Sequence, residues 1–435
     1  MLKESNMRTV RLTAETKNDL LDSLLKRSPN RYGEYEQRVA AILDDVAARG
    51  DEAVFEYTAK FDGVEINENN ILVTEDEIKE AYDKIDPKVL EVIKKAAANI
   101  RKFHEKQKRN SWFDYEDGII VGQRVIPIGT VGIYVPGGRA PLSSTVLMNA
   151  VTATVAGVKR LIMLTPPSKE GKIHESVLVA ADVAGVTEIY KCGGAQAIGA
   201  MAYGTKSIPK VDKIVGPGNI YVALAKKRVY GNVGIDSIAG PSEILVLADE
   251  TANPRFVAAD LLSQAEHDPL ASSILITTSE ELAKKVDAEV KAFTEILERK
   301  EVIEKSLENF GYILIADSME DAIAAANDIA SEHVEIVTKD PYEVMTHIYN
   351  AGACFLGEYS SEPLGDYFAG PNHVLPTNGT ARFFSPLSVD DFIKKSSVIS
   401  YSREALEKVH EDIETFACAE GLTAHANSVK VRFEK

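Results

Sequence analysis

Cysteine is scarce in this chain of 435 residues, which contains only Cys192, Cys354 and Cys418. Three cysteines so far apart form neither a disulfide framework nor a cysteine-based zinc site. Long apolar runs are also missing: the best candidate, residues 144–158, is too short and too rich in threonine and asparagine to cross a bilayer. The first six residues lack the apolar core of a signal peptide. We therefore expect a soluble protein of the reducing cytoplasm without a membrane partner.

Positive charge is in deficit. The chain carries 49 lysines and arginines against 66 aspartates and glutamates, which gives a formal net charge of -17. Such a balance argues against a nucleic-acid partner, whereas a cationic substrate would not be repelled. The length and the 45% of hydrophobic residues predict a large core divided among two or more domains.

The pattern of apolar residues changes near residue 111. Before it, apolar residues at three- and four-residue spacing predict helices, as in 35–55 and 89–103. After it, short β-rich runs alternate with helical stretches, which is typical of parallel sheets. The predicted strands are 119–123, 131–135, 160–164, 188–191 and 213–215, and the helices are 143–156, 175–184, 195–203 and 220–230.

The alternation then begins a second time, which predicts two similar α/β units. The second set of strands is 243–248, 273–277, 312–316, 334–337 and 354–356, with helices over 254–265, 280–299 and 319–331. The last segment, from about residue 381, has the stretch FFSPLSVDDF and one charged helix over 403–416. It has the character of an arm, and such arms commonly pack on a neighbouring subunit.

Histidine is rare, with eight in the chain, yet His267, His333 and His373 each lie beside a carboxylate or an amide. His425 stands near the C-terminus, five residues after Glu420. Imidazoles beside carboxylates bind metals, move protons, or do both.

Gln264 and His267 lie three residues apart at the predicted end of a helix, so their side chains project from one face. A metal ion is one interpretation. A helix terminus stopped by Asp268-Pro269 is the other.

The pair Glu332-His333 opens a predicted strand, and ligands of α/β folds gather at strand ends. It is either a proton-transfer pair, in which the glutamate positions or activates water, or a surface pair at a turn. Residues 365–373 form either a binding loop, with Asp366 and His373 as its functional groups, or a plain connection.

Glycine-rich turns at 135–139, 192–196 and 215–219 each precede a predicted helix. Backbone amides at such helix starts suit a phosphate or a flat cofactor, although none of the turns has the G-x-G-x-x-G spacing and each alone can be a turn without a ligand. Cys192 in the second turn could act as an aldehyde-trapping nucleophile. No histidine lies near it in the sequence, so a buried structural cysteine is the preferred interpretation.

Specific segments in one order give the chain a close resemblance to the histidinol dehydrogenase family. They are GIYVPGGRAPLSSTVLMNAV, CGGAQAIGA, VGPGNIYVALAK, GPSEILVLAD, LLSQAEHDP, SEHVEI, GDYFAGPNHVLPT and GLTAHANSVKVRF. The resemblance covers most of the chain and is least distinctive in the N-terminal helical region. It implies two similar incomplete Rossmann-like units with parallel sheets, and a C-terminal arm swapped in a homodimer.

The resemblance also implies a division of the chain. It predicts an N-terminal helical segment over 1–27 and a metal and substrate α/β domain formed by 28–130 with 243–380. An NAD-binding domain over 131–242 and a dimerisation arm over 381–435 complete the division.

Residue roles follow from the same resemblance. One zinc ion per subunit is expected on Gln264, His267, Asp366 and His425, the last delivered by the swapped arm. The catalytic pair falls on Glu332 and His333. Substrate contacts fall on Ser242, His373 and Glu420, together with the four zinc ligands and His333. Contacts with NAD fall on Tyr134, Gln196 and Asn219.

The implied reaction is oxidation of L-histidinol to L-histidine, the last steps of histidine biosynthesis, through bound L-histidinaldehyde and with two NAD molecules in turn. Mixed nitrogen and oxygen ligands would also accept manganese or cobalt, so zinc depends on the resemblance. Two alternatives remain: a metal-dependent hydrolase with Glu332 as base, and a non-catalytic protein that binds an amino alcohol or a metal.

Overall fold

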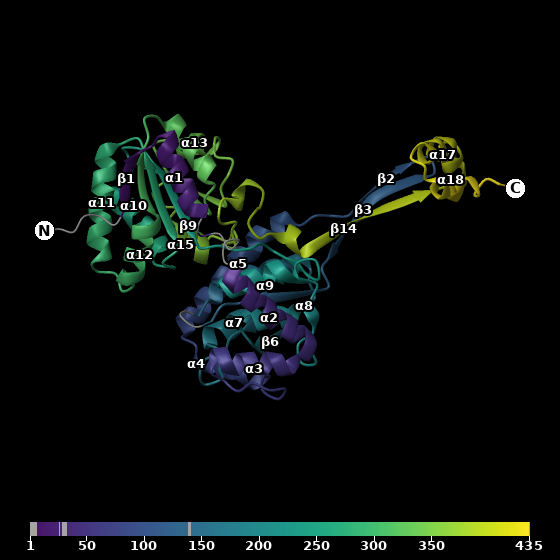
Figure 1. Ribbon diagram of the computed structural model, residues 1–435, viewed down its shortest axis with the longest axis horizontal. Coiled ribbons are helices and arrows are strands. Elements are labelled where there is room, and N and C mark those ends of the chain that lie inside the picture. Colours follow the sequence, from purple (N-terminus) through teal and green to yellow (C-terminus); the bar gives the residue numbers. More distant parts are fainter. Residues whose placement is uncertain (1–6, 26, 28–32, 138–140, 435) are drawn as a thin grey trace. The chain divides into compact units, whose positions relative to one another are not determined.

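Two parallel sheets flanked by helices form most of the chain (Figure 1). The computed structural model describes residues 7–25, 27, 33–137 and 141–434. The chain divides into a first unit, Met1–Gln107 with Gly129–Phe392, and a second unit, Lys108–Ile128 with Ile393–Lys435. The predicted mixed α/β class with parallel sheets is confirmed.

The six-stranded sheet of the first unit has the order β1-β11-β10-β9-β12-β13, and all neighbouring strands are parallel. Its central strands β9, β10 and β12 are buried along their whole length, as expected of strands covered on both faces. The strands are β1 (Arg8–Arg11), β9 (Glu243–Ala248), β10 (Ser272–Thr277), β11 (Gly311–Ile315), β12 (His333–Val337) and β13 (Ala353–Leu356).

Helices cover both faces of this sheet because successive strand side chains point to opposite sides. In β9, Ile244 and Val246 belong to one core cluster, whereas Leu245 and Leu247 belong to another. The first face is covered by α10 (Pro254–Ala265), α11 (Glu280–Thr294) and α12 (Lys300–Phe310), and the second by α1 (Ala14–Leu25) and α13 (Met319–Ile329). The short helices α14 (Pro341–Met345) and α15 (Glu362–Tyr367) flank β13 in the sequence.

The five-stranded sheet of the same unit has the order β6-β5-β4-β7-β8 and is also parallel. Its strands are β4 (Thr130–Tyr134), β5 (Arg160–Thr165), β6 (Glu188–Lys191), β7 (Lys213–Val215) and β8 (Gly234–Ile235). The helices between and after them are α6 (Ser143–Ala156), α7 (Glu175–Ala184), α8 (Gly194–Tyr203) and α9 (Ile220–Val229).

The helices between residues 33 and 104 pack on α6–α9, which differs from the predicted grouping of 28–130 with 243–380. Their apolar positions, such as Val39 and Leu43, join the core of the five-stranded sheet. Amphipathic spacing shows which face of a helix is buried but not which partner buries it. These helices are α2 (Gly33–Arg49), α3 (Asp51–Asp62), α4 (Glu75–Lys84) and α5 (Pro87–His104), with contacts to α6, α7, α8 and α9.

The N-terminal segment, predicted to be helical over 1–27, contributes the edge strand β1 before α1. Four residues are too few for a period-two pattern to be visible in the sequence. The single helix predicted over 280–299 ends at Thr294, and α12 follows it. By contrast, α6, α7 and α10 begin and end at the predicted residues.

The second unit is an antiparallel sheet of β14 (Ile393–Tyr401), β3 (Ile119–Pro127) and β2 (Trp112–Glu116), in that order, followed by three helices (Figure 1). The arm predicted over 381–435 therefore begins at Ile393 and includes a hairpin from 108–128, because β3 pairs along the whole of β14. The predicted helix over 403–416 is instead α16 (Arg403–Glu407) and α17 (His410–Ala419), and α18 (Thr423–Lys430) follows.

Short 3₁₀ turns complete the description: η2 (Glu105–Gln107), η3 (Thr380–Arg382) and η4 (Val389–Phe392). In the part of the chain that the structure describes, no helix has both the length and the apolar character needed to cross a membrane.

Gly216 after β7 tests the close packing of the first unit. It has a φ of 109°, and an added Cβ would lie 2.1 Å from the Tyr134 carbonyl oxygen. We expect Gly216→Ala to lower the free energy of unfolding by about 3–5 kcal/mol, because backbone strain and overpacking add. The matched control is Gly231→Ala, whose φ is 103° but whose Cβ would meet nothing within 4 Å. This control should lower the free energy of unfolding by about 1–2 kcal/mol, from backbone strain alone. Equal losses of stability for the two variants in denaturant titrations would contradict the steric explanation.

Candidate active site

A cavity of about 630 Å³ in the first unit collects most of the predicted site residues. Ser242, Glu332 and His333 lie at the amino ends of β9 and β12. Asn219 reaches the cavity from the loop that follows β7. The site thus uses the amino ends of the six-stranded sheet, whereas ligand sites of open α/β sheets usually lie at carboxyl ends.

His333 is held so that one ring nitrogen faces the acids of the cavity. Its Nδ1 lies 2.9 Å from the Glu243 carbonyl oxygen, and a carbonyl only accepts, so Nδ1 carries the proton. In the neutral ring Nε2 then keeps a free lone pair. Nε2 is buried without a hydrogen-bond partner among the described residues, 3.8 Å from Asp366 Oδ1 and 3.9 Å from Glu362 Oε1. A neutral ring held in this way would present Nε2 as a proton acceptor.

Burial and neighbouring charges set the protonation of the pair. Burial by itself lowers the pKa of His333, but Glu332, Asp366 and Glu362 raise it to about 10. Burial raises the pKa of Glu332 to about 8, although His333 opposes that shift. A cation beside Asp366 would repel protons from both groups and lower both pKa values towards neutrality.

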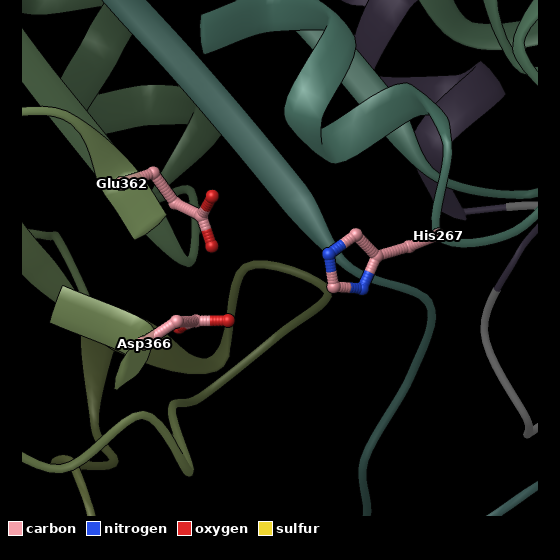
Figure 2. Close-up of side chains that lie close together, drawn as sticks. All are labelled: His267, Glu362 and Asp366. Carbon is pink, nitrogen blue, oxygen red and sulfur yellow. The ribbon is translucent and has the colours of Figure 1, made fainter. Parts of the chain in front are cut away.

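Three side chains near this pair are arranged to hold a cation. Ligand atoms of His267, Glu362 and Asp366 all lie within 4.8 Å of one another. Figure 2 shows the two carboxylates of α15 on one side and the His267 imidazole facing them on the other. Glu362 and Asp366 are four residues apart on the helix, so they share a face.

Two orphaned oxygen atoms support the interpretation as a metal site. Gln264 is 1% exposed, and its Oε1 has no hydrogen-bond partner within the described part of the chain. The same holds for Glu362 Oε1. Buried oxygens are rarely left unpaired, and a hard or borderline cation would satisfy both.

Glu362 is the site residue that sequence reasoning missed. Its Oε2 accepts from Ser263 Oγ at 3.1 Å, and burial together with Asp366 raises its pKa to about 8. The sequence signal for Glu362 is its position four residues before Asp366, which places both side chains on one face of a helix. The loop predicted over 365–373 conceals this signal, because Asp366 in fact lies in α15.

A hydrogen bond links the His373 side chain to the backbone of Asp366. His373 Nδ1 lies 3.0 Å from the Asp366 carbonyl oxygen, and His373 Nε2 lies 3.4 Å from Thr145 Oγ1. Burial raises the pKa of Asp366, but His333 and His373 outweigh it and bring it to about 2. Asp366 therefore remains an anion among neighbours that hold protons.

Of the three residues assigned to NAD, one lines the cavity and two do not. Asn219 lines the cavity and caps α9, accepting from Tyr221 N at 3.0 Å. Tyr134 and Gln196 are buried and are absent from the described lining of this cavity. The Tyr134 hydroxyl accepts from Gly194 N at 3.1 Å. Both polar atoms of the Gln196 amide lack a hydrogen-bond partner in the described residues.

The turn predicted over 135–139 lies partly outside the described residues, which resume at 141. Cys192 in the second turn is fully buried, and burial raises the pKa of its thiol to about 12. A thiol with so high a pKa is inert, which favours the structural interpretation.

Glu420 and His425 belong to the second unit. They line a hollow between α17 and α18 with Ile413 and Phe416. The cavity of the first unit thus brings together eight of the predicted residues, whereas these two lie on the other unit. The eight are Asn219, Ser242, Gln264, His267, Glu332, His333, Asp366 and His373.

Comparisons with known proteins agree with one another. A family model described as histidinol dehydrogenase matches residues 25–433. The histidinol dehydrogenase of Caldanaerobacter subterraneus subsp. tengcongensis is 58% identical over 421 residues, which cover 97% of this chain and 98% of that protein. The one from Bacillus subtilis is 56% identical over 411 residues, which cover 94% and 96%.

A solved structure gives the same result. The crystal structure of histidinol dehydrogenase from Elizabethkingia anophelis matches with a TM-score of 0.92 at 40% identity, covering 99% of this chain and 98% of that one. The chain belongs to the histidinol dehydrogenase family.

Proposed function

We propose that this chain oxidises L-histidinol to L-histidine through bound L-histidinaldehyde, using two NAD molecules in turn. Family membership supports an enzyme of histidine biosynthesis that acts on histidinol. The observation that carries the mechanism is the buried His333 Nε2, which lies without a described partner beside Asp366 and Glu362.

His333 is proposed as the base of the first oxidation. Its Nδ1–H is fixed to the Glu243 carbonyl, so Nε2 would take the alcohol proton, while NAD, when bound, would supply the acceptor for the hydride of the carbinol carbon. The proton would stay on the ring until water adds to the aldehyde. The product of this step is the aldehyde.

Glu332 is proposed to activate water for the second oxidation. Its Oε2 lies 3.7 Å from His333 Nδ1, and its raised pKa suits proton transfer near neutral pH. The carboxylate would remove a proton from water as the oxygen attacks the aldehyde carbon, and His333 would return its proton to the aldehyde oxygen, which gives the hydrate. The neutral His333 ring could then deprotonate the hydrate in the second oxidation, for which a second NAD would supply the hydride acceptor.

Gln264, His267 and Asp366 would hold a zinc ion, with His425 of the partner subunit as the fourth ligand. Zinc bound by these residues would supply a Lewis acid for positioning the substrate. The protein surroundings keep the aldehyde between the steps and exclude side reactions in water. Ser242, His373 and Glu420 are proposed substrate contacts, and Tyr134, Gln196 and Asn219 are proposed contacts of NAD.

The second unit is proposed as a dimerisation arm. It exposes large apolar side chains, with Tyr115 71% and Ile399 74% exposed, and Phe416 70% exposed. Exposed apolar side chains gathered on one small unit are typical of a protein interface. An arm that crosses to a second subunit would bring Glu420 and His425 to the partner's cavity.

The proposed reaction fixes the ratio of products. We expect two molecules of NADH for each L-histidinol consumed, measured by absorbance and by analysis of the remaining substrate. A ratio of one would mean that the reaction stops at the aldehyde. No NADH at all would reject the oxidation and leave a metal-dependent hydrolase or a binding protein as the alternatives.

His333→Gln tests the assignment of the base. We expect kcat to fall by about 100- to 10,000-fold, because a positioned proton acceptor is lost. The affinity for L-histidinol, measured by calorimetry with zinc present, should change little, because His333 is not among the proposed metal ligands. Turnover at the wild-type rate would show that another group accepts the proton.

Mixing two inactive variants tests the shared site. Asp366→Ala and His425→Ala should each abolish activity, and their mixture should regain part of it after subunit exchange. A mixed dimer would contain one site with both Asp366 and His425 intact. Controls are each variant exchanged with itself. A mixture that exchanges subunits, as shown by mass spectrometry, yet stays inactive would contradict the swapped arm.

A further inference from the structure

Glu243, the first residue of β9, contacts both members of the proposed catalytic pair. In the parallel register His333 faces Ile244, so Glu332 and Glu243 lie side by side where the two strands begin. Glu243 N donates to Glu332 Oε2 at 2.9 Å, and Glu332 N donates to Glu243 Oε2 at 3.3 Å. The two acids therefore exchange hydrogen bonds, each with the backbone of the other.

The other contacts of Glu243 fix its own side chain. Its Oε1 accepts from Asn378 N at 3.1 Å and from the Arg27 guanidinium. Its backbone carbonyl accepts from His333 Nδ1. Glu243 thus contacts the Glu332 carboxylate through its backbone amide, the Glu332 backbone amide through its side chain, and the His333 ring through its carbonyl.

Arg27 supplies the counter-charge. The side chains of Arg27 and Glu243 are 0% and 4% exposed. Arg27 Nη1 donates to the Leu270 carbonyl oxygen at 2.9 Å, and the guanidinium lies 5.2 Å from the centre of the Phe310 ring. Burying the Glu243 carboxylate so deeply costs free energy unless a positive charge pairs with it. The acidic Glu332 beside it provides no such charge, so Arg27 is the group that does.

We propose that Glu243 is a positioning residue that holds the Glu332 carboxylate in place, with Arg27 as its counter-ion. This inference rests on the proposed function, because it assigns Glu332 to the activation of water. Neither residue touches the reacting atoms. Both act through Glu332.

The geometry predicts that the two oxidations respond differently to a change at Glu243. The Glu243→Gln side chain keeps an oxygen acceptor but presents an amide group to Arg27 or to the Glu332 backbone amide, which disturbs the exchange with Glu332. The substitution retains both backbone contacts of residue 243, its N–H to the Glu332 carboxylate and its carbonyl to His333 Nδ1. The change reaches Glu332 through the Glu332 backbone amide, which loses its charged acceptor. The step that needs Glu332 should therefore slow more than the step that needs only His333.

The experiment follows each oxidation separately in the zinc-loaded, full-length enzyme. In Glu243→Gln, we expect kcat with L-histidinaldehyde to fall by about 10- to 100-fold, as misplacement of a reacting group costs. The first NADH formed from L-histidinol in a single turnover should keep nearly the wild-type rate. With semicarbazide present to trap free aldehyde, the ratio of NADH to histidinol should fall from two towards one.

Variants at Arg27 and a matched control complete the test. Arg27→Met should shift the ratio in the same direction as Glu243→Gln, and Arg27→Lys, which keeps the charge, should shift it less. The control Glu77→Gln changes the acceptor of another part-buried ion pair, to Lys191 at 2.5 Å, outside the cavity. It should leave the ratio at two.

Three outcomes would overturn the inference. Equal slowing of both oxidations in Glu243→Gln, with the ratio still at two, would reduce Glu243 and Arg27 to structural roles. Full loss in Glu243→Gln through misfolding, combined with a ratio of two in soluble Arg27→Lys and Arg27→Met, would do the same. A wild-type enzyme that makes no NADH would overturn the proposed function as well, and so separates the two failures.

Discussion

The parallel pairing of β9 with β12 is the constraint on which the rest of the site depends. It sets Glu243 beside Glu332 at the start of both strands, and it points the His333 ring at the cavity. Both strands are buried on two faces, so their register is fixed by apolar packing rather than by the polar residues at their ends. The core of the sheet therefore provides the rigidity that the chemical groups need.

Burial gives this group of acids and imidazoles its chemical character. It raises the pKa of Glu362 and of Glu335, whose Oε1 accepts from Glu362 N at 2.8 Å, while nearby imidazoles keep Asp366 ionised. Asp366 is ionised, its neighbours hold protons, and Gln264 Oε1 has no hydrogen-bond partner among the described residues. Such a site is suited to release protons when a cation binds. The same low dielectric that makes the site costly to bury strengthens each interaction within it.

Local sequence was sufficient where a feature depends on neighbours in the chain. The predicted bounds of α10 agree with the structure, but the helix ends at Ala265 and His267 lies in the turn after it, so Gln264 and His267 do not share a helix face. Local sequence was insufficient for Glu362, whose helix was predicted as a loop, and for the second unit. There β14 pairs with β3, a contact between distant segments that no local pattern encodes. Likewise, the sequences of the amphipathic helices α2–α5 do not show which of the two sheets has the core that they join.

The sequence by itself determined the α/β class and most strand and helix positions, and it supplied the candidate groups of the site, because periodicity and residue type are local properties. Only the tertiary structure decided that the site lies at the amino ends of β9 and β12, and that Glu362 joins His267 and Asp366. It also decided that Arg27 pairs with Glu243. These are contacts between residues far apart in the chain, and they exist only once packing has set the register of the sheet.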